Sequence, residues 1–358
     1  MSRLLLLCLV AGCGMKLHQF PAVDDTGGAG GEETGGSSGG GGAVQPPSGK
    51  QDAAATTTEP DGSRPDPEPG PDARAAGGSG GGAPDARTAP PRDTGTPPSG
   101  ATVMIGGMAV PKENAIVFIH IGHSDMCGRA TGPASLMSFF YGTDPHLWVY
   151  GKGAKWSAAK EPTACPEPGA TRAGPGMAIL RTALAHAPDL YFISIGHGHS
   201  GSTSGFCPNF RRSGLLYNTY MDAAKELKGK VTFGGIYTMF GITEYHLGTP
   251  GLMSLGDCLA GIAKDVREDL GDPNIPLMVG DWNMGGTGIY SPTGEYGSIA
   301  RPQIQMVPMK TTRAAVISTV GLPMEDDRHL NMTGHKMWSE RGFMLMKDMG
   351  WAPWATAP

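Results

Sequence analysis

The chain has 358 residues, a formal net charge of −5 and a pI of about 6.1. The sequence contains neither a basic patch nor a run of interleaved aromatic and basic residues, so we do not expect nucleic acid as a partner. Apart from a short apolar run at residues 4–10, no segment resembles a membrane span, and that run is too short to cross a bilayer.

The first residues are typical of an export signal. Arg3 gives a positive start, and the apolar run follows it. Val10-Ala11-Gly12-Cys13 then resembles a bacterial lipobox, in which small residues precede a cysteine that is lipidated and becomes the new N-terminus. We expect residues 1–13 to be a lipoprotein signal peptide, and Cys13 to anchor the exported protein to the bacterial cell envelope, at the outer membrane or cell surface. An ordinary cleaved signal with an incidental cysteine is the alternative.

Residues 14–101 consist largely of small, polar and proline residues. Such a segment cannot bury enough apolar surface to offset the entropy of ordering it. We therefore predict a disordered tether that holds a domain away from the membrane. The remaining residues, 102–358, form one predicted domain that is long enough for a full core.

Apolar runs and helical spacing alternate along this domain. Continuous apolar, β-branched runs predict strands at 115–121, 190–195, 235–240, 275–279 and 314–319. Helical spacing predicts helices at 177–187, 217–227, 253–270 and 334–349. Thr333 is the candidate N-cap of the last helix. The alternation predicts the α/β class, as a three-layer α/β/α sandwich with a mainly parallel sheet of about five strands.

Four cysteines lie in the predicted domain: Cys127, Cys165, Cys207 and Cys258. In an oxidising compartment they allow three pairings, and the sequence does not distinguish them. We expect two disulfides, with four buried thiols as the alternative. Because no CxxC pair occurs, we do not expect a structural zinc site.

Polar residues follow each predicted strand, where a parallel sheet places its ligands. Six of the ten histidines lie at or just after these strands: His120, His123, His197, His199, His246 and His329. Other polar groups follow the later strands, at 243–246, Asp281, Asn283 and 326–329. We expect the functional site at this edge of the sheet.

Two of these loops carry residues suited to nucleophilic catalysis. Ser124 lies just past the first strand, between Gly122 and Gly128, where a tight turn exposes a hydroxyl and a backbone N–H. A serine that caps the next helix is the alternative. In the last loop Asp326 and His329 are three residues apart. An aspartate can hold the imidazole there while the imidazole takes the serine proton.

Together these loops resemble the SGNH-hydrolase superfamily. The likeness is to its carbohydrate-esterase branch, which includes sialate O-acetylesterase and acetylxylan-esterase-like proteins. In that branch the first block reads Gly-Gln-Ser-Asn-Met-Ala-Gly and the last reads Asp-x-x-His. Residues 147–156, 174–176 and 266–281 also resemble the family in order and spacing, so the resemblance covers about 113–350. It implies an SGNH- or flavodoxin-like sheet.

The resemblance also implies a function. Ser124 would be the nucleophile, His329 the base and Asp326 its orienting carboxylate. The backbone N–H groups of Ser124 and of Gly174 or Gly176 would bind the oxyanion. The implied activity is removal of O-acetyl groups from carbohydrate through an acyl-enzyme, without a metal or an organic cofactor.

The chain departs from the family pattern around the serine. His123 and Asp125 replace the family's Gln and Asn. A carboxylate beside a developing oxyanion is unfavourable unless it is paired, and Arg129 is a candidate partner.

The third family block, Gln-Gly-Glu, becomes Ile242-Thr243-Glu244. Ile242 cannot donate a hydrogen bond, and loss of one oxyanion donor costs about 100-fold or more in rate. Thr243, His197 and His199 are candidate substitutes, and Glu244 is a further candidate site residue.

Two other functions stay open. The altered residues Ile242, Asp125 and His123 suggest a decayed esterase that binds glycans at the cell surface. His197 and His199 share one side of an extended segment, and with His123, His246 and Asp281 they suggest a zinc-dependent hydrolase. We favour pocket or loop histidines over a metal site. Three tryptophans could stack on a sugar, although core positions are favoured for each: Trp148, Trp156 and Trp282.

Overall fold

The computed structural model describes residues 100–165, 171–199, 205–281, 291 and 293–355. The predicted signal peptide with Cys13, the predicted tether up to residue 99, and Trp282 and Asn283 lie outside the described residues. In the described part, no helix is both long and apolar enough to span a membrane.

A seven-stranded sheet forms the centre of the fold, in the order β5-β4-β6-β3-β7-β8-β9. Every neighbouring pair is parallel except β4 and β5, which are antiparallel. The strands are β3 (Ala115–Gly122), β4 (Leu147–Gly151), β5 (Lys155–Ala158), β6 (Tyr191–Gly198), β7 (Thr232–Met239), β8 (Leu277–Gly280) and β9 (Ala314–Ile317). The predicted α/β class with a mainly parallel sheet is confirmed, and each of the five predicted strands is present.

The strand count was predicted too low. The strands β4 and β5 extend the sheet at one edge, and β1 (Thr102–Ile105) pairs with β2 (Met108–Pro111) in a separate hairpin. These strands have four or five residues and are partly exposed, so they lack a long apolar run. The rings of Trp148 and Trp156 meet edge to face across β4 and β5, 6.4 Å apart. Both tryptophans therefore contribute to the packing of the β4–β5 edge of the sheet.

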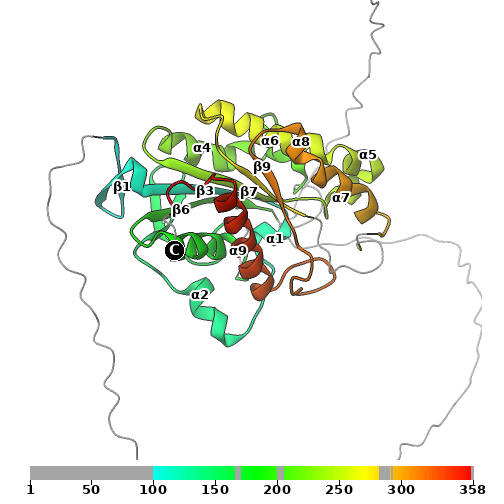
Figure 1. Cartoon of the computed structure of the whole chain (residues 1–358), viewed down its shortest axis with the longest axis horizontal. Helices are drawn as coiled ribbons and strands as arrows, with labels where there is room; N and C mark the ends of the chain where they lie inside the picture. The colour runs from blue at the N-terminus through cyan, green and yellow to red at the C-terminus, as the bar shows by residue number, and fades with distance from the viewer. Residues whose placement is uncertain (1–99, 166–170, 200–204, 282–290, 292, 356–358) are drawn as a thin grey trace, which may run out of the picture. The chain divides into compact units, whose positions relative to one another are not determined.

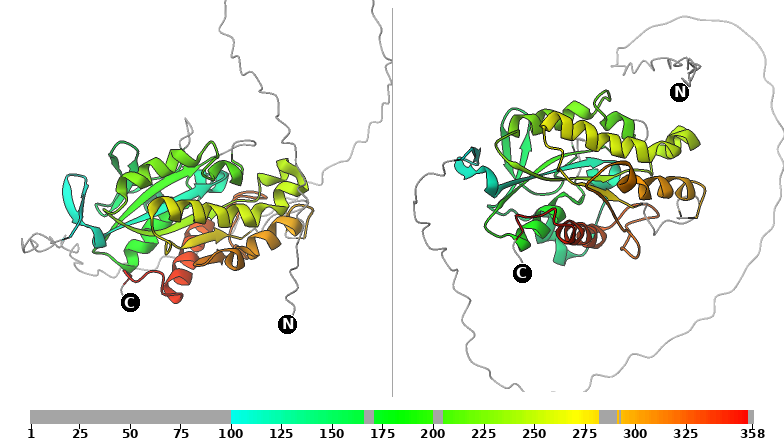
Figure 2. Two further views of the ribbon diagram at one scale, coloured as in Figure 1. Left: turned by 90° about the horizontal axis from the view of Figure 1, so that it is seen from above. Right: turned by 45° about the horizontal axis from the view of Figure 1, so that its top comes forward.

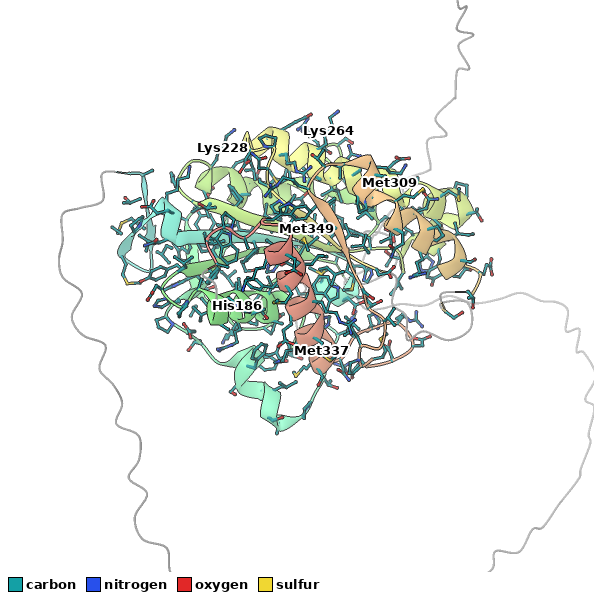
Figure 3. The ribbon with its side chains drawn as sticks, viewed as in Figure 1. His186, Lys228, Lys264, Met309, Met337 and Met349 are labelled. Carbon is teal, nitrogen blue, oxygen red and sulfur yellow. A yellow bond between two sulfur atoms is a disulfide. The ribbon has the colours of Figure 1, made fainter. Side chains whose placement is uncertain are left out.

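Helices cover both faces of the sheet (Figures 1 and 2). On one face pack α3 (Gly176–His186) and α9 (Met332–Asp348), and on the other α4 (Tyr217–Leu227) and α6 (Leu255–Leu270). Successive residues of β3 alternate between the two cores, so the whole strand is buried and reads as a continuous apolar run. In Figure 3, His186 lies beside α9, where its ring stacks on Phe343 at 4.4 Å.

Shorter helices complete the fold: α1 (Ser124–Cys127), α2 (Met137–Tyr141), α5 (Gly248–Met253), α7 (Gly297–Gln305) and α8 (Val307–Lys310). Among the described residues, four 3-10 turns lie between the longer elements: η1 (Lys112–Asn114), η2 (Ala134–Leu136), η3 (Cys207–Phe210) and η4 (Glu244–Leu247).

Two helix boundaries differ from the predictions. The predicted helix 253–270 is divided, since α5 ends at Met253 and α6 begins at Leu255. Thr333 is not the N-cap of α9. Asn331 occupies that position, because its Oδ1 accepts the Gly334 N–H at 2.9 Å.

The four cysteines form two disulfides, as expected, and the structure resolves their pairing. Cys127 at the end of α1 is bonded to Cys165 in the segment before α3. Cys207 of η3 is bonded to Cys258 of α6. The first bond therefore fixes the short helix that begins with Ser124.

Candidate active site

A cavity of about 340 Å³ opens at the carboxyl ends of the parallel strands, the edge at which we expected the site. Three loops build most of it, following β3, β7 and β9. Its lining residues are Ser124, Arg129, Arg172, Ile242, Thr243, Tyr245, His246, Asp326, Arg328 and His329.

Three of the lining residues form a hydrogen-bonded chain. Ser124 Oγ lies 2.7 Å from His329 Nε2. His329 Nδ1 lies 2.7 Å from Asp326 Oδ2 and 3.0 Å from Oδ1. A carboxylate can only accept, so Nδ1 carries the proton and Nε2 is left to accept from the serine hydroxyl. The structure thus brings together the three residues predicted for catalysis.

Asp326 is anionic at neutral pH. Burial by itself raises the pKa of this carboxyl. Hydrogen bonds from the His329 ring and from the backbone N–H groups of Arg328 and His329 outweigh burial, and the pKa falls below the ordinary value of 3.8. Asp326 therefore orients His329 and stabilises the imidazolium that would form when the serine is deprotonated.

The two residues before Ser124, Gly122 and His123, set the conformation of the turn between β3 and α1. Gly122 has φ +155°, and a Cβ there would collide with the Met239 carbonyl on β7. His123 caps α1, since its Nδ1 accepts the Asp125 N–H at 3.2 Å. Burial lowers the pKa of His123 to about 3, so it is neutral and structural.

Ser124 supplies the first backbone N–H of α1. Within the part of the chain that the structure describes, that N–H has no hydrogen-bond acceptor. It is therefore available as an oxyanion donor.

Asp125 is fully buried and does not line the cavity. Its Oδ1 accepts the Leu330 N–H at 3.0 Å. We expected Arg129 as its partner, but the Arg129 side chain lines the cavity instead.

One of the two glycines predicted as oxyanion donors, Gly174, has its N–H engaged inside the protein. The Gly174 N–H donates to Oε2 of the buried Glu161 at 3.2 Å. Glu161 also accepts the Thr163 N–H at 3.0 Å and the Met177 N–H at 2.7 Å. Gly176 lies so close to the Thr163 side chain that a Cβ at position 176 would collide with it. Glu161 therefore shapes the loop before α3 and occupies the Gly174 N–H, whereas the Gly176 N–H stays a predicted oxyanion donor.

In the loop after β7, some residues line the cavity and another holds the loop in place. Ile242 and Thr243 line the cavity. Glu244 is buried and accepts the N–H groups of Gly241 at 2.7 Å and Cys207 at 2.8 Å. Glu244 therefore holds this loop against η3, and this candidate site residue does not line the cavity. The Thr243 hydroxyl donates weakly to Gly205 O at 3.4 Å.

The alternative of a metal site is not supported by the described residues. No group of three or more His, Cys, Asp or Glu side chains there could hold a metal ion. The His197 ring packs against Phe210 with centroids 6.1 Å apart, and neither His197 nor His199 lines the cavity. Burial, and then the neighbouring His199, lower the pKa of His197 to about 4. Asp281 lies 3.3 Å from Arg301.

Sequence reasoning missed several residues of the cavity. Arg172 donates to Arg129 O at 3.3 Å and lies 3.9 Å from Glu325. Arg328 pairs with Asp327 at 2.8 Å. Tyr245 stacks on Tyr296 with centroids 5.0 Å apart. Arg172 and Arg328 lie in irregular loops and Tyr245 lies in the short turn η4, where no periodic pattern shows which side chains face one another.

Comparisons with known proteins identify the fold and the family of this chain. A search of curated protein sequences gave no significant match. Among solved structures, the chain resembles a protein of Arabidopsis thaliana, with a TM-score of 0.54 and 17% identity over 68% of this chain and 100% of the other. It also resembles NanS, with a TM-score of 0.50 and 14% identity over 68% of this chain and 99% of NanS. At this identity the likeness shows a shared fold.

The sequence itself matches the family described as carbohydrate esterase, sialic acid-specific acetylesterase, over residues 114–348. Because this match spans well over half of the chain, the protein belongs to that family of carbohydrate acetylesterases, which are carboxylic ester hydrolases.

Proposed function

We propose that the chain removes O-acetyl groups from carbohydrate with a Ser124-His329-Asp326 triad. Ser124 Oγ attacks the acyl carbon while His329 Nε2 takes its proton, and the Ser124 N–H stabilises the oxyanion. The sugar oxygen leaves with the proton from His329. Water, deprotonated by His329, then attacks the acyl-enzyme and releases acetate and free Ser124.

One observation carries this proposal. The Ser124–His329 distance of 2.7 Å and the His329–Asp326 distance of 2.7 Å join a nucleophile, a base and an orienting anion in one chain. All three residues line the same cavity, so an ester can reach them. The described residues offer no comparable cluster for a metal-dependent hydrolase.

The cavity wall favours an acidic sugar as the substrate. Arg129, Arg172 and Arg328 line it together, while Asp326 is the carboxylate among the lining residues and is engaged with His329. Guanidinium groups bind carboxylates well, because their planar donors match the two oxygens. We expect kcat/KM to be higher for an O-acetylated sialic acid than for a neutral acetylated xylo-oligosaccharide.

Arg172→Gln tests this preference. About half of the Arg172 side chain is exposed, and it lies 3.9 Å from Glu325. Because an exposed ion pair of this kind adds little to stability, the change should leave the fold intact. We expect kcat/KM for the acidic substrate to fall by about tenfold, equivalent to one charge-assisted hydrogen bond, and turnover of p-nitrophenyl acetate to stay unchanged. An equal loss on both substrates would contradict the preference for an acidic sugar.

The cell envelope is the proposed place of action. The lipobox-like sequence that ends at Cys13 and the small, polar residues that follow it support a lipid anchor and a tether. Acetylated carbohydrate at the cell surface would then be within reach of the enzyme.

The purified full-length chain, its Ser124→Ala variant and a chelator decide the reaction class. We expect turnover of p-nitrophenyl acetate and of acetylated sugars that the chelator leaves unchanged and Ser124→Ala abolishes. Turnover that Ser124→Ala leaves intact would refute the triad. A folded wild-type protein that hydrolyses no ester but binds sugar would instead support the decayed, glycan-binding alternative.

A further inference from the structure

The residue after the nucleophile links the two halves of the predicted triad. Asp125 is the second residue of α1 and is completely buried. A carboxylate is costly to bury unless hydrogen bonds or charges compensate for its lost hydration. The surroundings of Asp125 therefore indicate what the carboxylate does.

Asp125 joins α1 to the loop that carries the base. Its Oδ1 accepts the backbone N–H of Leu330 at 3.0 Å, across 205 positions of sequence. Leu330 directly follows His329 and is itself fully buried. On the other side of His329, Asp326 Oδ1 accepts the His329 N–H at 2.8 Å. The backbone of His329 is thus held on both sides by carboxylate oxygens, one from its own loop and one from the helix of Ser124.

Two buried histidines flank Asp125. His123 Nδ1 lies 3.9 Å from Oδ2, and His335 Nε2 of α9 lies 3.9 Å from Oδ1. Both rings are almost completely inaccessible to solvent and therefore restrict the carboxylate to the orientation that meets Leu330.

We propose that Asp125 is a positioning residue that keeps His329 Nε2 within hydrogen-bond distance of Ser124 Oγ. This role rests on the proposed esterase function. It works through the hydrogen-bond acceptor Oδ1, and the residue does not touch the substrate. Displacement of a catalytic group by about 1 Å can cost on the order of 100-fold in rate, so losing this bond should act on kcat.

Two substitutions separate the acceptor from the charge. Asp125→Asn keeps an Oδ1 acceptor for the Leu330 N–H, and we expect kcat within about threefold of wild type. Asp125→Ala removes the acceptor, and we expect kcat to fall about 30-fold or more with KM nearly unchanged. Circular dichroism and the melting temperature of each full-length variant show whether it is folded.

Thr131→Val is the matched control. Thr131 also bonds the base loop, through Glu325, but its backbone N–H keeps that contact at 2.8 Å when the hydroxyl is lost. We expect kcat within about twofold of wild type. Equal losses in Thr131→Val and Asp125→Ala would show a general loosening of the loop and overturn the specific role of Asp125.

Hydrogen exchange at the Leu330 amide provides a readout besides turnover. The amide should be protected in wild type and in Asp125→Asn, and should exchange faster in Asp125→Ala. A folded Asp125→Ala variant with wild-type kcat overturns the proposal, as does an Asp125→Asn variant that is as inactive as Asp125→Ala. A wild-type protein without esterase activity overturns the proposed function instead, and unchanged exchange in Asp125→Ala then overturns the proposed bond separately.

Discussion

At the scale of single residues, the site combines the hydrogen-bonded chain of Ser124, His329 and Asp326 with a changed residue at position 242. Among the described residues, the Ser124 N–H is available, while the Gly174 N–H is bound to Glu161. Ile242 lines the cavity at the position that matches the Gln of the Gln-Gly-Glu block named above. Its side chain offers no hydrogen-bond donor. We therefore expect an added hydrogen-bond donor at position 242 to assist the proposed reaction.

Ile242→Gln should supply a further donor. Because one oxyanion donor is worth about 100-fold or more in rate, we expect kcat on p-nitrophenyl acetate to rise by about tenfold or more. Ile242→Leu, which changes shape without adding a donor, is the control and should leave kcat nearly unchanged. A lower kcat in the glutamine variant would mean that another group already occupies the donor position.

At the scale of the elements, buried carboxylates hold the loops that surround the site. Glu161 binds three backbone N–H groups and joins the segment before α3 to the start of that helix. Burial raises the pKa of Glu161, and the three N–H groups lower it. Burial is the larger effect, so the pKa rises from 4.5 to about 7. The proton is therefore bound more tightly in the folded protein than in the unfolded chain.

This shift predicts how stability depends on pH. Below pH 4.5 Glu161 is protonated in both states, and its contribution is fully present. As pH rises from 4.5 to about 7, the unfolded chain loses its proton first, and up to about 3 kcal/mol of stability is lost. Glu161→Gln removes this titration. The free energy of unfolding, measured with denaturant, should therefore fall more steeply with pH in wild type than in the variant between pH 5 and about 7. Parallel pH profiles would contradict the shift.

The sequence predicted regular elements better than contacts between loops. The five strands β3, β6, β7, β8 and β9 have buried apolar runs that are readable without a structure. The edge strands β4 and β5 are short and partly exposed, and they give no such signal.

The residues of the proposed triad could be selected because each follows a predicted strand and lies in a block that resembles a family motif. Glu161 and Gly174 could not be assigned their contact, because the N–H···carboxylate bond between them depends on how an irregular loop folds. For the same reason Asp125 was matched with Arg129, which is near in sequence, and not with Leu330, which is near in space.

At the scale of the whole molecule, the proposed anchor places the esterase at a membrane surface. The proposal depends on Cys13, the cysteine of the lipobox-like sequence. A bacterial host that expresses the full chain should recover wild type in the membrane fraction after cell disruption. Cys13→Ser should be recovered in the soluble fraction, because a lipid chain supplies the membrane affinity. Membrane recovery of both proteins would refute the lipid anchor.

The acyl-enzyme tests the central claim most directly. Wild-type protein is mixed with p-nitrophenyl acetate, quenched with acid during turnover, digested and examined by mass spectrometry. We predict one acetyl group on Ser124, and none at that position in the Ser124→Ala variant. Steady turnover with Ser124 unmodified, or with the acetyl group on another side chain whose removal stops the reaction, would contradict the Ser124-His329-Asp326 mechanism.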